Sequence, residues 1–397
     1  MTIVVLLILA GITISLVFSE NGIIAKAKEA AEKTNQAAIN EQAQMNEVDA
    51  AINNILNGTG GGSTPPNPEE PEKPVMPEGW DNTKVNAVES ADKVVVPVPK
   101  GYTESSVATE NKVSEGFVIY ENTNGEDKKE EVNDSNKDIA RTTRNQFVWV
   151  PVANSSEMYG TDKNGKKWGK LYNFSASGIT AENWTEQGGV MSITDARRRY
   201  REPDIIDADS SNSVTISQLE TEFNNMIESV KKYGGFYIGR YETGNLSQSK
   251  ASVIKNNSDI GNQTWHTMYN KAKGIAVNSN VTSSMIWGSQ WDATMRWMYN
   301  SGNAEKKKYT YDSTGKGNYS SDSPIATGSI EAYAVNNIYD MAGNVGDWTI
   351  EAYETYSRID RGGLYSDSSN FYPAYIRHDS LSIVALDNLG FRVALYM

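Results

Sequence analysis

The start of the chain carries a long apolar run, and a more polar segment follows it. Residues 1–18, MTIVVLLILAGITISLVF, contain no charge and no proline, and the first charged side chain is Glu20. At about 1.5 Å per residue, a helix of this length covers roughly 27 Å, slightly less than the roughly 30 Å hydrocarbon core of a membrane. The run predicts a helix that almost spans a membrane, and a secretory signal peptide is the alternative.

The helical pattern continues beyond the apolar run. Residues 21–56 are rich in Ala, Glu, Lys and Gln and contain no proline, a composition that favours helix. Apolar positions such as Ile23, Ala27 and Ala31 keep a roughly helical period, so one narrow stripe is available for packing. We therefore expect a single hydrophobic and then amphipathic helix over residues 1–56.

Two further regions follow. Residues 57–79 are rich in Gly, Pro and Glu and lack the apolar content of a folded segment, which predicts a linker. From Trp80 the chain alternates short apolar runs with turn residues, and residues 80–397 are expected to form a head domain. Helical spacing of apolar residues predicts helices over 215–234 and 289–300. Strands are expected at 93–99, 116–121, 145–152, 234–242, 284–288 and 390–397.

These patterns together predict an α+β protein. Its long N-terminal α-helix would precede an irregular, loop-rich head with short antiparallel strands and two or more helices.

Composition removes several kinds of chemistry. The 397 residues include no cysteine, which excludes disulfides, thiolate metal sites and cysteine nucleophiles. The only two histidines, His266 and His378, cannot build a three-histidine metal centre. A net charge of −13 argues against a nucleic-acid partner, because phosphate binding needs clustered Lys and Arg. The 9 Trp and 21 Tyr residues, set among Asn, Ser and Gly, are typical of a recognition surface.

Five short motifs lie in order along the head. They are GGFYIGRYE (234–242), SQWDATMRWM (289–298), NNIYDMAGNVGDW (336–348), RGG (361–363) and LGFRVAL (389–395). In this order they resemble the formylglycine-generating-enzyme and sulfatase-modifying-factor family, a branch of the C-type lectin fold. The resemblance implies the fold but not the chemistry. The copper-binding cysteine pair of those enzymes is absent, and two distant histidines cannot form the iron site of the related sulfoxide synthases. We expect a head that is not an enzyme.

The first residues carry a second resemblance. The stretch IVVLLILAGITISLVFSENGIIAKAKEA, residues 3–30, resembles type IV pilin-like subunits of Gram-positive anaerobes, although the processing site of that family is not in the sequence. The resemblance implies a homopolymeric surface filament whose subunits are inserted in the inner-membrane lipid before assembly. The expected location is therefore the cell surface.

The motif at 336–348 contains a candidate calcium site. Asn344 and Asp347, with backbone oxygens at Val345 or Gly346, offer the oxygen ligands that a hard cation prefers. Members of the resembled family often carry calcium at the equivalent loop. The alternative is structural, because Asn and Asp also cap turns and satisfy buried backbone groups.

The segment between the last two motifs is a candidate ligand-binding surface. Aromatic rings there can stack on a sugar or peptide, while neighbouring polar groups supply directional hydrogen bonds. In C-type-lectin-fold proteins this stretch forms the exposed ligand face, and in some it is varied by diversity-generating retroelements. The alternative is an irregular loop whose aromatic residues cover the core. The candidates are Tyr365, Asp367, Asn370, Phe371, Tyr372, Tyr375, Arg377 and His378.

The leading hypothesis is an extracellular pilin-like filament subunit that displays a non-catalytic head for adhesion to an unidentified glycan or protein. A membrane-anchored receptor-like lectin and a purely structural filament coat are the alternatives. A carboxylate-based enzyme acting on glycans is the third class, although no acid–base pair is recognisable from spacing.

Overall fold

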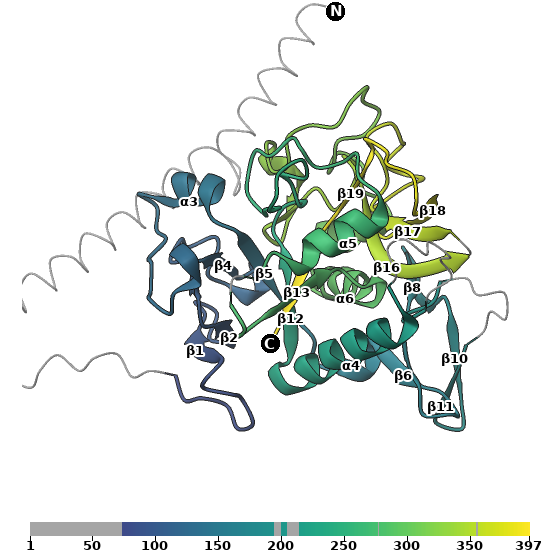
Figure 1. Cartoon of the computed structure of the whole chain (residues 1–397), viewed down its shortest axis with the longest axis horizontal. Helices are drawn as coiled ribbons and strands as arrows, with labels where there is room; N and C mark the ends of the chain where they lie inside the picture. The colour runs from purple at the N-terminus through teal and green to yellow at the C-terminus, as the bar shows by residue number, and fades with distance from the viewer. Residues whose placement is uncertain (1–73, 194–199, 205–213, 277, 355) are drawn as a thin grey trace, which may run out of the picture. The chain divides into compact units, whose positions relative to one another are not determined.

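The computed structural model describes residues 74–397, apart from 194–199, 205–213, 277 and 355 (Figure 1). Its largest sheet has six strands in the order β13-β20-β12-β5-β4-β3, and every neighbouring pair is antiparallel. The strands are β3 (Tyr102–Glu104), β4 (Val118–Glu121), β5 (Gln146–Pro151), β12 (Gly235–Gly239), β13 (Thr282–Met285) and β20 (Val393–Tyr396).

The middle of this sheet is apolar on both faces. β5 reads QFVWVP and β12 reads GFYIG, runs that are almost continuous in large apolar residues because both faces of these strands are covered. Phe147, Val148 and Ile238 are fully buried. β20 lies between β12 and β13. The last strand of the chain therefore pairs with two strands that come more than 100 residues earlier in the sequence.

A second sheet of four strands has the order β18-β17-β16-β19. The β16–β19 pair is parallel, and the other two pairs are antiparallel. β18 is therefore an edge strand, and its residues are exposed or half-buried. The strands are β16 (Gly346–Glu354), β17 (Ser357–Arg361), β18 (Arg377–Leu381) and β19 (Leu389–Phe391).

Five two-stranded sheets accompany the two larger ones. Their strands are β1 (Val85–Glu89) with β2 (Val95–Pro99), β6 (Tyr159–Thr161) with β7 (Lys167–Gly169), β8 (Tyr172–Ser175) with β9 (Gly178–Ala181), β10 (Trp184–Gln187) with β11 (Val190–Ile193), and β14 (Ala334–Val335) with β15 (Ile338–Tyr339). Short 3₁₀ turns lie at η1 (Val113–Glu115), η2 (Thr123–Gly125), η3 (Ser155–Glu157) and η4 (Glu331–Tyr333).

The helices pack against the sheets. α4 contacts β12 and β20, α5 contacts β13, and α6 contacts both β5 and β16 (Figure 1). α4 begins with a capping box between Thr215 and Gln218 and ends at Gly234, whose φ of 81° suits a residue without a side chain. The helices are α3 (Lys137–Thr143), α4 (Ile216–Tyr233), α5 (Trp265–Lys273), α6 (Gly288–Tyr299) and α7 (Ala304–Tyr311).

The expected fold class is wrong. The described residues are mostly β-sheet with five short helices, of which the longest has 18 residues, and none is a long N-terminal helix. The expected helix over 1–56 and the linker up to residue 73 lie outside the described residues. Much of what the sequence suggested to be irregular loop is instead built from hairpins with strands of two to five residues, which are too short and too polar to show a clear period.

Other expectations are confirmed. The helices expected at 215–234 and 289–300 are α4 and α6, and the runs at 116–121, 145–152 and 234–242 contain β4, β5 and β12.

Membrane insertion was expected only of the first residues of the chain, which the structure does not describe. Within the part of the chain that it does describe, none of the helices combines the length and the apolar character that a membrane span requires.

Candidate functional site

Most of the Asn and Asp residues of the motif at 336–348 occupy backbone positions with positive φ. Asn336, Asn337, Asp340 and Asn344 all have φ between 51° and 65°. This left-handed region is unfavourable for most side chains, and Asn and Asp tolerate it better than others because they hydrogen-bond locally. The motif is thus a series of tight turns that leads into β16.

Asn344 uses both ends of its side-chain amide inside the protein. Its Oδ1 accepts from the backbone N–H of Ile325 at 2.8 Å and from Asn318 Nδ2 at 3.1 Å. Its Nδ2 donates to Glu242 Oε2 at 2.6 Å, and Glu242 Oε1 accepts from the N–H of Val345 at 3.2 Å. Asn344 is completely buried, so these bonds join three segments of the core.

Asp347 is also completely buried, and Arg392 Nε donates to its Oδ2 at 3.1 Å. Burial raises the pKa of Asp347 to about 6 although Arg392 opposes the shift. The N–H of Gly346 donates to the carbonyl of Asn388 at 2.9 Å. These contacts favour a structural role, because they use the oxygen of Asn344 and set a positive charge beside Asp347.

Calcium at residues 344–347 stays a prediction. Among the described residues no group of three or more His, Asp or Glu is placed to hold a metal ion. A thermal-shift titration with calcium, after chelation, checks the prediction: a bound ion raises the unfolding temperature by mass action, and a flat titration removes it.

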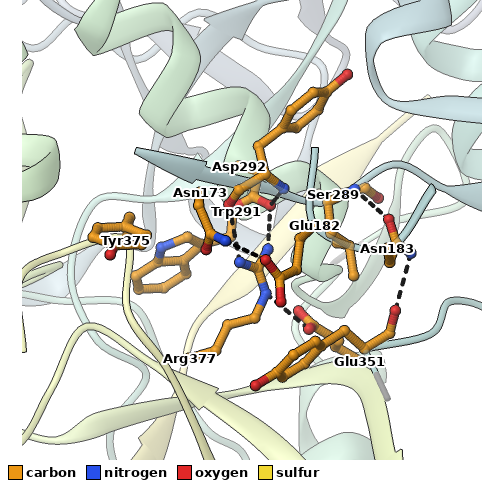
Figure 2. A network of polar contacts seen from close by, with 12 residues as sticks. Asn173, Glu182, Asn183, Ser289, Trp291, Asp292, Glu351, Tyr375 and Arg377 are labelled. Atoms are coloured by element: carbon orange, nitrogen blue, oxygen red, sulfur yellow. Dashed lines mark hydrogen bonds and ion pairs between the residues drawn. The ribbon is translucent and has the colours of Figure 1, made fainter. Parts of the chain in front are cut away.

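A buried cluster of charges lies beneath the predicted ligand-binding segment. Asp292 on α6 and Glu351 on β16 face Arg361 on β17 and Arg377 on β18, and no side chain of the four is more than 5 % exposed. Figure 2 shows Arg377 between the two carboxylates. Arg377 Nε lies 2.9 Å from Glu351 Oε1, and Arg361 Nη1 lies 3.3 Å from Glu351 Oε2. Both arginines also pair with Asp292.

A fifth titratable group, Glu202, lies beside this cluster. Its carboxylate accepts from the N–H of Ser289, at 3.0 and 3.1 Å. A β-carbon added at Gly288 would collide with both Glu351 Oε2 and Glu202 Oε1, so the two carboxyl groups meet over this glycine. Burial, and then repulsion from Glu351, raises the pKa of Glu202 to about 8. Two of the three acids thus share the two arginines, while Glu202 lies against Glu351 and the N–H of Ser289, and its raised pKa favours the protonated form at neutral pH.

The cluster fixes the end of the segment between β17 and β18. Arg361 donates from Nη2 to the carbonyl of Tyr375 at 3.0 Å and from Nε to that of Ile376 at 3.0 Å. Trp291 Nε1 donates to the carbonyl of Ala374 at 2.9 Å. The backbone is therefore held by groups below it and not by its own outward-facing side chains.

The structure separates the eight predicted ligand-binding residues into two sets. Arg377 points into the buried cluster, and Tyr375 packs its ring on Phe174 at 5.9 Å between centroids. Asp367 is used locally, because its Oδ2 accepts from the N–H of Leu364 at 2.8 Å. The outward set is exposed or half-buried and consists of Tyr365, Asn370, Phe371, Tyr372 and His378.

Exposed hydrophobic side chains concentrate in the same part of the chain. Of the eleven large hydrophobic residues that are exposed in the described residues, six lie between 356 and 386. Phe371 is 72 % exposed, Leu381 is 52 % and Ile383 is 51 %. We call residues 356 and 365–388 the C-terminal surface. Its exposed hydrophobic residues are Tyr356, Phe371, Tyr372, Leu381, Ile383 and Leu386.

His378 adds a titrating group to this surface. Its Nδ1 lies 3.6 Å from Oδ2 of the buried Asp360, and its side chain is 52 % exposed. The neighbouring carboxylate of Asp360 raises the pKa of His378 above its usual value of 6.5. Ser380 Oγ also donates to Asp360 Oδ2, at 2.9 Å.

The sequence pattern did not single out Glu202, Asp292, Glu351 and Arg361 as site residues. Asp292 and Arg361 lie within the motifs SQWDATMRWM and RGG. The motifs drew attention to these positions but did not predict that the two side chains form an ion pair. Nothing in the spacing of four charges that lie up to 159 positions apart predicts their contact. The crossing of α6 with β16 brings them together.

Comparison with known proteins supports the expected type of head. Residues 276–397 match the family described as the sulfatase-modifying factor enzyme 1-like domain. The resemblance drawn from the motifs is therefore confirmed for this part of the head. A search of curated proteins found no match.

Three solved structures are similar to part of the chain. CarF is 14 % identical with a TM-score of 0.32, and the match covers 41 % of this chain and 87 % of CarF. Treponema denticola variable protein 1 is 15 % identical with a TM-score of 0.29, over 41 % of this chain and 85 % of its own. PvdO from Pseudomonas aeruginosa is 15 % identical with a TM-score of 0.28, over 42 % and 82 %.

Proposed function

We propose that the head is a non-catalytic binding domain whose ligand, a glycan or a protein, contacts the C-terminal surface. The observation that carries the proposal is the concentration of exposed hydrophobic side chains between residues 356 and 386. Scattered single apolar residues are normal on a protein surface, whereas a contiguous apolar patch is typical of an interaction site, and the proposal takes these residues to form one.

The support beneath this surface fits the same role. The segment before β18 is held at Ala374, Tyr375 and Ile376 by Trp291 and Arg361. A binding surface on a rigid base loses little conformational freedom when a ligand is bound. It also tolerates changes in its outward side chains, because these do not maintain the backbone. Diversification by a retroelement would use this property, and comparison of the locus among sibling strains tests it.

Absence of catalysis is part of the proposal. The enzymes that the head resembles depend on cysteine, and this chain has none. The clustered carboxylates Glu202, Asp292 and Glu351 are completely buried and face arginines or backbone N–H groups, so they are not accessible to a substrate. A carboxylate-based glycosidase would need two acids that reach the scissile bond.

Binding is tested with the full-length chain on a glycan array and on intact cells of neighbouring bacterial strains. Phe371→Ser should abolish most binding without changing stability, because the ring is 72 % exposed. Ile139→Ser is the matched control, since Ile139 is 71 % exposed on α3 and lies outside the C-terminal surface. Equal binding by both variants, or no binding by the unchanged chain, would contradict the proposal and favour a structural coat.

Display on a surface filament is the second part of the proposal. It is supported only by the sequence pattern of residues 1–56, which lie outside the described residues. Cryo-electron microscopy of sheared surface material from the native host tests it. Filaments that carry this head on their outside support the proposal, while single copies in the membrane fraction favour an anchored receptor-like lectin.

A further inference from the structure

A cavity of about 400 Å³ lies at the end of β4, far from the C-terminal surface in sequence. Four parts of the chain form it: the end of β4, the turn η2, the junction of α3 with β5, and the loop at 245–254. Its volume falls within the range of about 300–1,000 Å³ of small-molecule sites. The residues that line it all lie outside the five motifs that suggested the family of the head.

The cavity contains a carboxylate without an ionic partner. Glu121 is half-buried, and one of its oxygens accepts a hydrogen bond from Asn145 Nδ2 at 2.5 Å. Among the described residues Glu121 makes no ion pair within 4.0 Å, although the charges of Lys250 and Arg144 act on its carboxyl group from farther away and lower its pKa. Burial raises the pKa of this carboxyl group. Partly desolvated charges are costly when unpaired, which is why they are commonly found where a ligand binds.

The walls around Glu121 are fixed before any ligand arrives. Arg144 donates from Nε to the carbonyl of Glu121 at 2.6 Å and from Nη2 to Asn122 Oδ1 at 3.1 Å. Asn145 Oδ1 accepts from the N–H of Val253 at 2.6 Å, which joins β5 to the loop at 245–254. A pre-formed wall keeps the ordering cost of binding small.

Further polar groups complement the carboxylate. Asn245 donates from Nδ2 to Ser252 Oγ at 2.7 Å, which leaves its amide oxygen available as an acceptor. Lys250 is exposed and lines the same cavity, where its ammonium group is a donor. Asn124 contributes a further exposed amide.

We infer that this cavity binds a small neutral polyhydroxyl ligand, a single sugar ring. Glu121 and Asn245 accept hydrogen bonds, and Lys250 and Ser252 donate them, so a ligand with vicinal hydroxyl groups satisfies both kinds. Charges of both signs line the cavity, Glu121 beside Lys250 and Arg144, so its field does not select a ligand that carries a single charge. Among the described residues that line the cavity none is aromatic, so the ring is held by hydrogen bonds without stacking.

Saturation-transfer NMR on the full-length chain tests the inference, with D-glucose, D-galactose, D-mannose and N-acetylglucosamine as probes. At least one probe should bind, with a dissociation constant of about 1 mM or tighter. Glu121→Gln should weaken that binding about tenfold, because a hydrogen bond to a charged acceptor is lost. Lys250→Ala, which changes only an exposed side chain, should weaken it as well.

Two control variants show whether binding depends on this cavity. Glu126→Gln removes an exposed carboxylate that does not line the cavity and should leave binding unchanged. Phe371→Ser should also leave it unchanged, since Phe371 belongs to the C-terminal surface. The absence of a signal for every probe overturns the inference. Binding that is unchanged in both Glu121→Gln and Lys250→Ala also overturns the inference. So does a loss of binding in Glu126→Gln as large as the loss in Glu121→Gln.

Discussion

At the residue scale, the charges buried beneath the C-terminal surface have the greatest effect on stability. Arg377 serves two carboxylates, Asp292 and Glu351, and also donates from Nη1 to the carbonyl of Tyr172 at 2.9 Å. Asp292 Oδ2 in turn accepts from the N–H of Tyr172 at 2.7 Å. One arginine therefore joins α6, β8 and β16 to the edge strand β18.

Replacement of this arginine should be severe. Arg377→Met should lower the free energy of unfolding by about 3–5 kcal/mol, because it leaves the buried Asp292 and Glu351 with Arg361 as their one remaining cationic partner. Urea denaturation measures the change. Lys93→Met is the control: Lys93 is 79 % exposed and pairs with Glu89 on the surface, so its loss should cost less than about 1 kcal/mol. Equal effects would mean that the buried cluster contributes little.

Glu202 should make stability depend on pH. Its pKa is about 8 in the folded protein, against 4.5 ordinarily, so between these values the folded state binds more protons than the unfolded state. Stability from this group is complete below about pH 4.5 and falls as the pH rises through about 8. Glu202→Gln should therefore flatten the decline in unfolding temperature between about pH 5 and about pH 9, by a few degrees.

The control for this prediction is Glu186→Gln. Glu186 is exposed on β10, and its replacement should leave the pH profile as it was. A profile for Glu202→Gln parallel to that of the unchanged protein would show that Glu202 ionises in the folded state as it does in water.

At the element scale, α4 shows how far local sequence determines a helix. Thr215 and Gln218 form its capping box, in which Gln218 N donates to Thr215 Oγ1 at 3.2 Å and Thr215 N donates to Gln218 Oε1 at 2.8 Å. Thr215→Ala should destabilise the protein by about 1 kcal/mol in urea denaturation. Thr221→Ala, an exposed change inside the same helix, should be neutral or slightly stabilising. Equal losses would argue against the cap.

The same scale shows what the sequence could and could not predict. α4 and α6 were predictable because their apolar residues recur at helical spacing over three turns or more. α7, AEKKKYTY, has no apolar stripe, and its helix depends on the cap at Asn303, which accepts from the N–H groups of Glu305 and Lys306. The hairpin β10–β11 is mostly exposed, so it carries little of the alternation that marks a half-buried strand.

Site residues divide along similar lines. Phe371 and Tyr372 stay predicted ligand-binding residues: aromatic residues among Ser and Asn suggested the role, and the structure adds that both side chains are exposed. The partners of Arg377 were not, because ion pairing across α6, β16 and β17 depends on tertiary packing that no local pattern encodes. From the sequence, residues 344–347 are predicted to bind a metal ion. The left-handed backbone of the motif at 336–348 offers another explanation for most of its Asn and Asp residues, because these residue types tolerate that conformation.

At the scale of the whole molecule, the two sheets differ in how far they tolerate change. Ala394 on β20 is completely buried and pairs with strands on both sides, at Ile238 and Ser284. Ala394→Glu should prevent folding, because it buries a charge without a partner, at a cost above about 4 kcal/mol. Leu381→Glu on the edge strand β18 should be tolerated, since that side chain is 52 % exposed. Soluble yield and circular dichroism distinguish the two; loss of both proteins would contradict this difference.

The place of β20 also has a consequence for the order of events during synthesis. In the described sheet, β13 pairs with β20 alone, and β12 keeps one open edge until β20 arrives. While translation proceeds from residue 285 to residue 396, the emerging chain exposes an unpaired apolar strand, the kind of edge that leads to aggregation. The strand order therefore leads us to expect that chaperones bind the nascent chain during this interval. It also leads us to expect a slow final folding step, because the last pairing joins distant parts of the chain.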